Sequence, residues 1–304
     1  MDNRPIGVFD SGIGGLTVVS SMVKALPNED IYYVGDTARV PYGNKSKKSI
    51  QKFSYQITNW LVKQDCKIIV VACNTVSSLA LQQLKTEFSI PIIGVIEPAV
   101  NHAISSTTNY NIGILGTQAT IKSDAYKKCI ISVNSNINVI SQACPLFVPL
   151  VEEGWVHGEI PSLVASIYLK KIKSTNVDTV ILGCTHYPLL KDIINKELGN
   201  KTRLIDSGES TANIVTSVLN NKKLSGNKMT YIYQFIRTYK YYFSEWLLPQ
   251  HNIFNADLEL KEVKNLQYYE NHQDLSKNPW NKNLGFKDEN SDLVSYRYIG
   301  TINL

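Results

Sequence analysis

The feature that most constrains the fold is a regular alternation of short apolar segments with stretches of helical periodicity. Residues 6–9 and 31–34 are strand-like, and Ile50, Phe53 and Ile57 then recur at helical spacing. Short buried strands that alternate with amphipathic helices are typical of a parallel sheet that helices cover on both faces. The sequence therefore predicts an α/β fold.

The same alternation predicts the other elements of the chain. Further strands are expected at 67–72, 91–96, 112–115, 138–140, 179–182 and 203–205. Helices are expected at 15–25, from 46 through the periodic residues, and at 77–88, 123–131 and 161–173. From about residue 230 no period is clear, and 258–263 fit a short strand or a helix equally. Residues from about 271 onward are expected to form a polar, weakly ordered tail.

The alternation restarts near residue 111, and the two halves of the chain match each other. Three pairs of segments match in the same order, at an offset of about 110 residues: 7–11 with 113–117, 71–75 with 182–186, and 96–99 with 205–208. Each match alone could be chance, because apolar strands followed by small polar residues are common. Together they predict an internal duplication. The fold would then consist of two similar lobes related by a pseudo-two-fold axis, each a parallel sheet flanked by helices.

Composition and charge exclude several classes of protein. Hydrophobic residues make up 43% and charged residues 19% of the chain, which argues against wholesale disorder. The net charge of +5 is modest and the lysines are scattered, so a nucleic-acid groove is not indicated. The polar start at residues 1–5 is unlike a secretory signal, and the longest apolar runs are too short to span a bilayer. We therefore expect a cytoplasmic protein that needs no membrane.

The cysteines are few and unpaired in sequence. There are five, and none forms a C-x-x-C pair. This pattern favours neither a disulfide framework nor a structural zinc site, so no metal is expected. Single thiols in a reducing compartment are either buried packing residues or reactive groups.

Two of the cysteines occupy matching places in the two halves. Cys73 and Cys184 each follow a buried strand and precede a small, hydroxyl-rich turn. Ligands of open parallel sheets bind beyond the carboxyl ends of the strands, and a helix start is expected to lower the pKa of such a thiol from about 8.5 toward neutrality. Two facing lobes would place one thiol on each side of a bound molecule, which suits proton transfer between its two faces. A packing role is expected for the others: Cys66, Cys129 and Cys144.

A glycine-rich turn at residues 10–15 follows the first strand. At a helix start, its N–H groups suit an anion. A dinucleotide fingerprint fails here, because Thr17 stands at the third glycine position. A substrate carboxylate fits better, although a tight turn alone would also explain Gly12 and Gly14.

Polar residues flank both cysteines. Side chains suited to holding amino and carboxylate groups are Asn74, Thr75 and Thr185. His186 could protonate, orient or stabilise a thiolate, and its place two residues after Cys184 favours this over a purely structural role.

Two further segments fit a functional and a structural role equally. In the loop at 35–43, Tyr42 and the N–H of Gly43 suit a polar substrate, but the loop also reads as an ordinary proline-containing turn. Glu152 and Glu153 form an acidic pair that suits solvent as well as function.

These segments resemble the signature segments of bacterial glutamate racemases. The resemblance runs from about residue 5 to about residue 219 and rests on 8–18, 35–43, 72–75, 94–99, 143–155, 182–189 and 205–209. It implies an isomerase that interconverts L- and D-glutamate without pyridoxal phosphate, any other cofactor or a metal. It also implies that the product D-glutamate serves peptidoglycan biosynthesis, and hence cell-wall biogenesis and cell shape.

The resemblance further implies roles for individual residues. Cys73 and Cys184 match the two catalytic acid/bases, with Cys73 acting on D-glutamate and Cys184 on L-glutamate. Residues that match positions assisting the proton transfers are Asp10, Glu152 and His186. Residues that match substrate-binding positions are Asp10, Ser11, Tyr42, Gly43, Asn74, Thr75, Thr117, Thr120, Thr185 and His186. The small molecule glutamate is the partner implied, no nucleic acid is required, and a homodimer is left open.

The duplication and the resemblance together predict the domain boundaries. Residues 1–97 and about 207–234 would form the first lobe and 98–206 the second, with the active site between them. Family members close soon after the equivalent of residue 230 with a strand and a helix. Residues 231–235 fit the start of that strand, but 235–304 do not match and form a divergent C-terminal extension.

Three alternatives are less favoured. A racemase of the same architecture for aspartate or a hydantoin would differ in the length of its side-chain pocket. A binding protein without turnover would make use of the unusual C-terminal extension, but it would not need two matched thiols. A nicotinamide oxidoreductase is disfavoured at Thr17 and would show cofactor absorbance.

Overall fold

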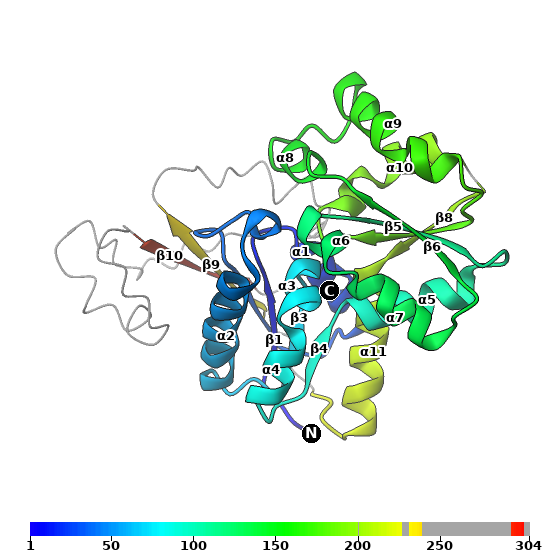
Figure 1. The fold of residues 1–304 in the computed structure, drawn as a ribbon. Helices are drawn as coiled ribbons and strands as arrows, with labels where there is room; N and C mark the ends of the chain where they lie inside the picture. Colours follow the sequence, from blue (N-terminus) through cyan, green and yellow to red (C-terminus); the bar gives the residue numbers. More distant parts are fainter. Residues whose placement is uncertain (200, 227–230, 239–292, 301–304) are drawn as a thin grey trace.

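The protein forms two sheets, each with helices on both faces (Figure 1). The computed structural model describes residues 1–199 and 201–226, and two further strands at 231–238 and 293–300. The first sheet has the strand order β10-β9-β2-β1-β3-β4. Its strands are β1 Ile6–Asp10, β2 Ile31–Gly35, β3 Ile68–Val71, β4 Ile92–Gly94, β9 Tyr231–Thr238 and β10 Leu293–Gly300. All neighbours in this sheet are parallel except β10, which runs antiparallel to β9 at the edge.

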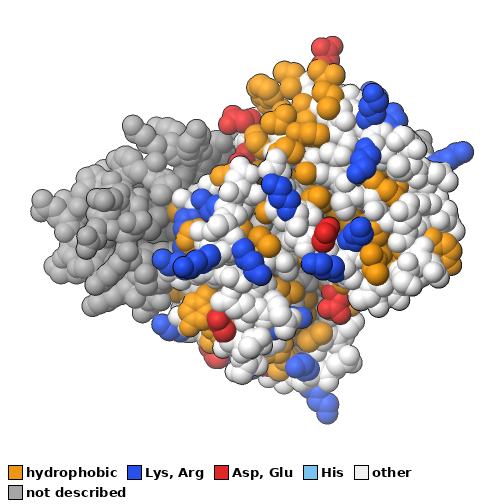
Figure 2. Space-filling model, viewed as in Figure 1, with side chains coloured by type: hydrophobic (Ala, Val, Ile, Leu, Met, Phe, Trp, Pro, Cys, Tyr) orange, Lys and Arg blue, Asp and Glu red, His pale blue; other side chains and the backbone are white. Residues whose placement is uncertain are grey.

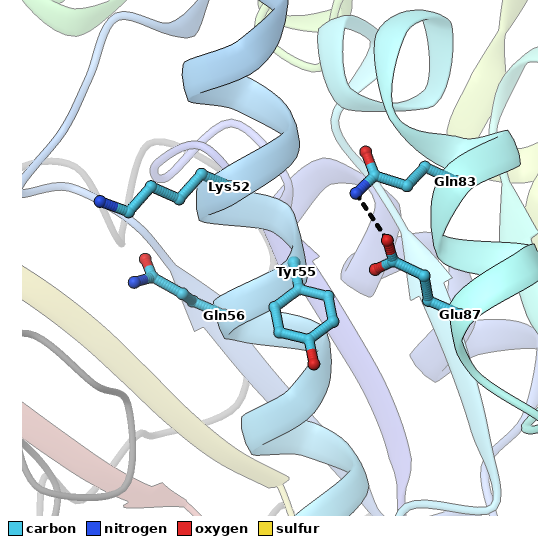
Figure 3. Close-up of a pocket in the computed structure, with 5 residues that line it drawn as sticks. All are labelled: Lys52, Tyr55, Gln56, Gln83 and Glu87. Carbon is cyan, nitrogen blue, oxygen red and sulfur yellow. Dashed lines mark hydrogen bonds between the residues drawn. The ribbon is translucent and has the colours of Figure 1, made fainter.

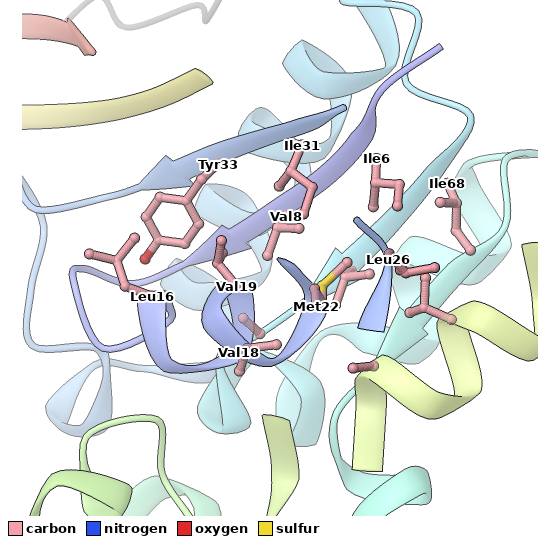
Figure 4. Close-up of a cluster of buried hydrophobic side chains, with 14 of the residues drawn as sticks. Ile6, Val8, Leu16, Val18, Val19, Met22, Leu26, Ile31, Tyr33 and Ile68 are labelled. Atoms are coloured by element: carbon pink, nitrogen blue, oxygen red, sulfur yellow. The ribbon is translucent and has the colours of Figure 1, made fainter. Parts of the chain in front are cut away.

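Helices cover the first sheet on both faces. They are α1 Leu16–Ala25, η1 Tyr42–Asn44, α2 Lys47–Lys63, α3 Asn74–Leu79, α4 Leu81–Glu87 and α11 Ser207–Asn221. Alternate residues of β1 point to opposite faces: Val8 packs in the cluster formed with α1 and α11, and Phe9 in the cluster formed with α2. Figure 4 shows the first of these clusters, in which Val19 and Met22 of α1 lie against β1. Strand β3, in the interior of the sheet, is apolar throughout and fully buried, as expected when both faces are covered.

The second sheet repeats this arrangement. Its order is β6-β5-β7-β8 and all its neighbours are parallel. Its strands are β5 Asn111–Gly116, β6 Asn138–Ala143, β7 Thr179–Gly183 and β8 Arg203–Asp206. Its helices are α5 Ile96–Ser106, α6 Gln118–Lys122, α7 Ala125–Val133, α8 Phe147–Glu152, α9 Glu159–Lys173, η2 Tyr187–Leu190 and α10 Lys191–Leu198. Two core clusters, one with α8 to α10 and one with α5 and α7, fill its two faces.

The strand order confirms the predicted duplication. The first four strands of the chain lie in the order β2-β1-β3-β4 in the first sheet, and the strands of the second sheet lie in the order β6-β5-β7-β8. Counted along the chain, the strands of each lobe therefore lie side by side in the order second, first, third, fourth. Cys73 and Cys184 both follow the third strand of their lobe.

The third matched pair of segments was wrong in detail. The expected strand at 91–96 ends at Gly94, Val95 adopts a helical backbone, and Ile96 begins α5, whereas Ile205 lies within β8. The equivalent helix starts are Ile96 and Ser207. Gly94 permits α4 to pack close to the end of β4, because a Cβ there would lie 2.5 Å from Leu81 Cδ2.

Two other expected elements differ from the structure. The helix expected at 77–88 starts earlier, at Asn74, and breaks at Ala80, which leaves the helical region with φ −127° and ψ −18°. The tail expected from residue 271 is wrong for 293–300, which form β10. The segment 258–263 lies outside the described residues.

The segments that follow the second lobe return to the first lobe. Helix α11 packs on α1 through Val215 and Leu219, and β9 pairs with β2 in parallel, with Tyr231 opposite Ile31. The expectation that 231–235 begin a strand of the first lobe is confirmed. Within the described residues, no helix combines the length and the apolar character needed to cross a membrane.

Candidate active site

The carboxyl ends of the two sheets meet where the lobes touch. Thr185, after β7, donates its hydroxyl to Asp10 Oδ1 at the end of β1, over 3.4 Å. The Thr17 hydroxyl donates to the carbonyl oxygen of Thr185 over 3.0 Å. The Tyr126 hydroxyl of α7 donates to Asn74 Oδ1 over 2.5 Å. The junction therefore collects residues from the strand ends of both lobes, as the topology predicts.

Cys73 caps the N-terminus of α3 and is buried. Its Sγ donates to Ser11 Oγ over 3.7 Å. Burial, and then the charge of Asp10, raise the pKa of the Cys73 thiol, against the opposing hydrogen bonds of the Val76 N–H and Ser11. The expectation that a helix start lowers this pKa was wrong for the unliganded site. The six residues of α3 form too short a dipole to offset the loss of water around the thiolate.

Cys184 belongs to a chain of three polar side chains. Its Sγ lies 3.8 Å from His186 Nδ1, and His186 Nε2 lies 3.1 Å from Glu152 Oε1 at the end of α8. Burial alone would lower the pKa of His186, but its hydrogen bonds and charge interactions with Cys184 and Glu152 outweigh burial and raise it well above 6.5. A protonated imidazole so close to sulfur stabilises a thiolate. Among the described residues, no basic group acts on the Cys73 thiol, whereas the Cys184 thiol has an imidazole beside it.

Asp10 organises the glycine-rich turn. Its Oδ2 accepts from the N–H of Gly12 over 3.1 Å and from the N–H of Gly15 over 3.0 Å. Two of the amides expected to bind a substrate carboxylate are thus engaged by Asp10 itself. The Asp10 carboxylate is fully buried. Its negative charge acts on the Cys73 thiol, and its Oδ1 accepts a hydrogen bond from the Thr185 hydroxyl.

Gly14 permits the close approach of the two lobes. A Cβ at this position would lie 2.4 Å from His186 Nδ1 and 2.5 Å from Thr185 Oγ1. No side chain fits there without displacing one of these groups. The glycine is needed for contact between the lobes, rather than for a positive φ angle.

Three threonine hydroxyls from both lobes form a cluster. Thr75 Oγ1 lies 3.1 Å from Thr117 Oγ1 and 3.3 Å from Thr120 Oγ1, and the last two are 3.0 Å apart. Thr117 caps α6 by accepting from the Thr120 N–H. Hydroxyls can donate and accept, so this cluster can turn its hydrogens toward a carboxylate.

Asn74 presents a hydrogen-bond donor that no described residue satisfies. Its side chain is buried, and its Oδ1 accepts from the Tyr126 hydroxyl. Its Nδ2 has no hydrogen-bond partner within the described part of the chain. Buried amide donors are rarely left unpaired, so this atom is a candidate to bind an acceptor of the substrate.

The loop at 35–43 reaches the junction at Gly43, where a Cβ would lie 3.1 Å from Thr117 Cβ. The Tyr42 hydroxyl donates to Asp36 Oδ2, and Arg39 Nε lies 2.6 Å from the same oxygen. The Arg39 guanidinium also lies over the Phe53 ring, 4.2 Å from its centroid. Because Asp36 engages the Tyr42 hydroxyl, a substrate contact from this loop would come from its backbone.

Sequence reasoning had not singled out three residues that shape the site. Asp36 and Arg39 lie in the loop that it selected, and their opposite charges three residues apart were a usable signal. Tyr126, which holds Asn74, lies on α7 and gives no signal in the sequence.

Of the other three cysteines, Cys144 packs in the same core cluster as Cys184. Cys66 and Cys144 are buried and Cys129 is partly exposed. Burial, and then the charge of Asp65, raise the pKa of Cys66 to about 12. Among the described residues, no group of three His, Cys, Asp or Glu side chains could hold a metal ion.

A surface recess lies between α2 and α4, outside this site (Figure 3). Its lining residues are Lys52, Tyr55, Gln56, Gln83 and Glu87. None of them contributes to the cluster around the two cysteines, so the recess does not compete with that cluster as the candidate site.

Comparison with known proteins places this architecture in context. Residues 6–215 match the family model described as Asp/Glu/Hydantoin racemase. A glutamate racemase of Geobacter metallireducens is 49% identical over 221 residues, which cover 73% of this chain and 82% of that protein. A glutamate racemase of Lactococcus lactis subsp. cremoris is 41% identical over 271 residues, which cover 87% of this chain and 98% of that protein. The crystal structure of glutamate racemase from Francisella tularensis, in complex with D-glutamate, matches with a TM-score of 0.71 and 45% identity, covering 75% of this chain and 86% of that one.

Proposed function

Because the chain belongs to the Asp/Glu/hydantoin racemase family, we propose that it is a glutamate racemase that moves the α-proton of glutamate between Cys73 and Cys184. One observation carries the proposal: two buried cysteines follow the third strand of two duplicated lobes, and the ends of those lobes meet. Relatives at 41–49% identity named glutamate racemases, and a similar structure holding D-glutamate, favour glutamate over aspartate or a hydantoin.

Substrate binding would rest on hydroxyls and amides from both lobes. The threonine cluster and Asn74 Nδ2 offer donors for the α-carboxylate of glutamate. Ser11 and Thr185, beside the two cysteines, complete the binding groups around the α-carbon, with the backbone at Tyr42 and Gly43. Because these groups come from both lobes, bound substrate would also hold the lobes together.

The two thiols would act on opposite faces of the α-carbon. With L-glutamate bound, Cys184 as thiolate removes the α-proton, and the Cys73 thiol donates its proton to the opposite face. The raised pKa of Cys73 fits this direction, since it keeps the thiol protonated until the carbanion-like state forms. With D-glutamate, the same steps run in reverse, with Cys73 as the base. The enantiomers have equal energy, so the enzyme sets the rate and the equilibrium mixture is racemic.

Charged neighbours would assist each half of the reaction. His186, held by Glu152, can stabilise the thiolate of Cys184 and receive or return its proton. Asp10 lies on the Cys73 side, where its negative charge disfavours a second anion in the resting site. Water-free surroundings strengthen both effects.

The wider role follows from the same proposal. D-Glutamate would be supplied for peptidoglycan synthesis, and a cytoplasmic site of action suits a reaction that depends on free thiols. The lobes would be divided as predicted, with 1–97 and about 207–234 in the first and 98–206 in the second. No cofactor is assigned a step.

Proton exchange tests the proposal. The purified chain is incubated with L-glutamate in heavy water without added cofactor, and optical rotation and deuterium at Cα are followed. Loss of rotation with deuterium uptake is expected, and Cys73→Ser and Cys184→Ser should each abolish racemisation. Cys66→Ser is the matched control, because Cys66 is also buried and neither Cys73 nor Cys184 is among the groups that shift its pKa. Exchange with aspartate but not with glutamate would overturn glutamate as the proposed substrate. No exchange with either amino acid, in folded protein, would overturn the racemase proposal.

A further inference from the structure

The Thr17 hydroxyl joins the first lobe to the backbone of the second. Thr17 is the second residue of α1, and its Oγ1 lies 2.9 Å from the carbonyl oxygen of Gly14 and 3.0 Å from that of Thr185. A hydroxyl has one proton to donate, so the two carbonyls share it. The Gly14 carbonyl also accepts from the Thr17 N–H over 3.0 Å. The bond to Thr185 is therefore the contact that depends on the side chain.

The Thr185 carbonyl belongs to the peptide group that joins Thr185 to His186. On the other side of Thr185 is Cys184, whose Sγ lies 3.8 Å from His186 Nδ1. The Thr185 hydroxyl donates to Asp10 Oδ1 over 3.4 Å. The first lobe thus holds both the side chain and the backbone of the residue between the thiol and its imidazole.

Other polar contacts between the lobes join side chain to side chain. Thr75 meets the hydroxyls of Thr117 and Thr120, and Tyr126 donates to Asn74. Such contacts leave the backbone of the partner lobe free to shift while its side chain adjusts. A bond to a backbone carbonyl fixes the peptide plane itself, because the donor must lie near the lone pairs of the oxygen.

Surface charge does not supply an equivalent contact. On the face in Figure 2, the Lys and Arg side chains are scattered over both lobes. The ion pairs of Lys67 and Lys173 each join residues of a single lobe. Scattered charges in water are screened and have no preferred direction. The orientation of the peptide before His186 therefore depends on short hydrogen bonds such as that of Thr17.

We propose that Thr17 is a positioning residue for the Cys184 half of the reaction: its hydroxyl holds the peptide between Thr185 and His186, so that the imidazole stays beside the thiol. This role rests on the proposed racemase function. Thr17 acts through the Thr185 carbonyl and exchanges no proton with the substrate. Cys73 contacts Ser11 of its own lobe, so the bond from Thr17 bears on Cys184 rather than on Cys73.

Thr17→Val tests the proposal, because it keeps the shape of the side chain and removes the hydroxyl. It should lower kcat/KM for glutamate by about 3- to 10-fold, the loss of one neutral hydrogen bond. The fall must be equal in both directions, since the enantiomers have equal energy. Thr17→Ser keeps the hydroxyl and should restore the rate. Thr216→Val is the matched control, because the partly buried Thr216 donates to the Ala212 carbonyl within α11, over 2.9 Å.

Isotope effects separate positioning from a general loosening of the protein. L-Glutamate deuterated at Cα loses its deuteron to Cys184, and deuterated D-glutamate loses it to Cys73. Because Thr17→Val should slow the Cys184 step alone, the isotope effect on kcat/KM should rise with deuterated L-glutamate and fall with deuterated D-glutamate.

The outcomes distinguish this role from the proposed function. In an active protein, a Thr17→Val rate equal to that of wild type, no recovery in Thr17→Ser, or isotope effects that do not move in opposite directions would each overturn the role of Thr17 alone. A wild type that does not racemise glutamate would overturn the proposed function and this role with it.

Discussion

Gly14 and His186 approach so closely across the junction of the lobes that a Cβ on Gly14 would lie 2.4 Å from the imidazole Nδ1. The same nitrogen faces Cys184 Sγ at 3.8 Å. A turn in the first lobe thus packs directly against the imidazole that lies beside the thiol of the second. The position of His186 depends on both lobes being in contact.

Gly14→Ala should therefore impair catalysis through His186. We expect racemisation to fall by at least about 100-fold, because the imidazole or the turn must shift. Overpacking should also lower the unfolding free energy by about 1–3 kcal/mol. Gly12→Ala in the same turn is the control, since its Cβ would meet only the flexible Val40 Cγ1, at 3.1 Å. Steady-state kinetics and urea unfolding measure both effects, and equal rates for the two variants would contradict the argument.

The protonation of His186 should depend on Glu152. Burial opposes the charged imidazole, but Cys184 and Glu152 raise its pKa well above 6.5. The stability gained from the charged imidazole is thus fully present below about pH 6.5 and is lost as pH rises through the raised folded-state value. The stability advantage of wild type over His186→Gln should shrink on going from neutral to alkaline pH.

Nuclear magnetic resonance of labelled histidine gives a direct measurement. Wild-type His186 should titrate above the unfolded value, and Glu152→Gln should move its titration to lower pH. Glu153→Gln is the neighbouring control, since Glu153 has no contact with the imidazole among those found for His186. An unchanged titration in Glu152→Gln would show that this carboxylate does not set the charge of His186.

The strand pattern was predictable because local signals agreed with the tertiary environment. Ile50, Phe53 and Ile57 gave α2 its period, and Ser46 caps it by accepting from the Ser49 N–H over 3.2 Å. Helix α5 was missed because the run that precedes it is apolar throughout. In such a run, a buried strand and the first turn of a buried helix look alike.

The places of Cys73 and Cys184 after matching strands were predictable, whereas the contacts of the candidate site were not. The matched positions of Cys73 and Cys184 pointed to the junction of the lobes before any contact was known. The bond between His186 and Glu152 joins residues far apart in sequence, and it exists only because α8 packs beside η2. The raised pKa of Cys73 also escaped prediction, because burial is a property of the assembled lobes.

Cys73 should be an unreactive thiol in the unliganded protein. Burial and the charge of Asp10 raise its pKa, so alkylation by iodoacetamide at about pH 8 should be slow relative to the partly exposed Cys129. Asp10→Asn removes the second largest cause and should speed alkylation of Cys73 while slowing racemisation. Mass spectrometry of the labelled peptides resolves each cysteine. Cys66 serves as the internal reference, and faster labelling of Cys66 as well would indicate general loosening instead.

The buried ion pair between Lys67 and Glu29 should stabilise the first lobe. Lys67 Nζ pairs with Glu29 and donates to the carbonyls of Asp2 and Leu224, each over 2.7 Å. Lys67→Met should lower the unfolding free energy by about 3–5 kcal/mol, because it leaves Glu29 buried and unpaired. Lys173→Met is the matched control: its pair with Glu197 is partly exposed, and about 1 kcal/mol or less is expected. Chemical unfolding of both variants measures the two free energies. Comparable losses of unfolding free energy would mean that burial does not make the Lys67 pair more important for stability than the Lys173 pair.

Asn74 gives the sharpest test of substrate binding, because its Nδ2 is a buried donor without a partner in the described chain. A hydrogen bond to a carboxylate contributes about 1.5–3 kcal/mol, so Asn74→Ala should raise KM for glutamate by about 10- to 100-fold. The unliganded variant should lose about 1–3 kcal/mol of stability, because the buried Tyr126 hydroxyl loses its acceptor. Glutamate should therefore raise the melting temperature of wild type more than that of the variant.

Tyr126→Phe is the control for Asn74, because it removes only the bond to Oδ1 and leaves the free donor in place. Its KM should change far less than that of Asn74→Ala. If the two variants raise KM equally, the amide is held for the packing of α3 against α7, and its donor does not meet the substrate. If only Asn74→Ala does so, the unpaired donor is preorganised for glutamate, and the unliganded protein tolerates its cost until substrate binds.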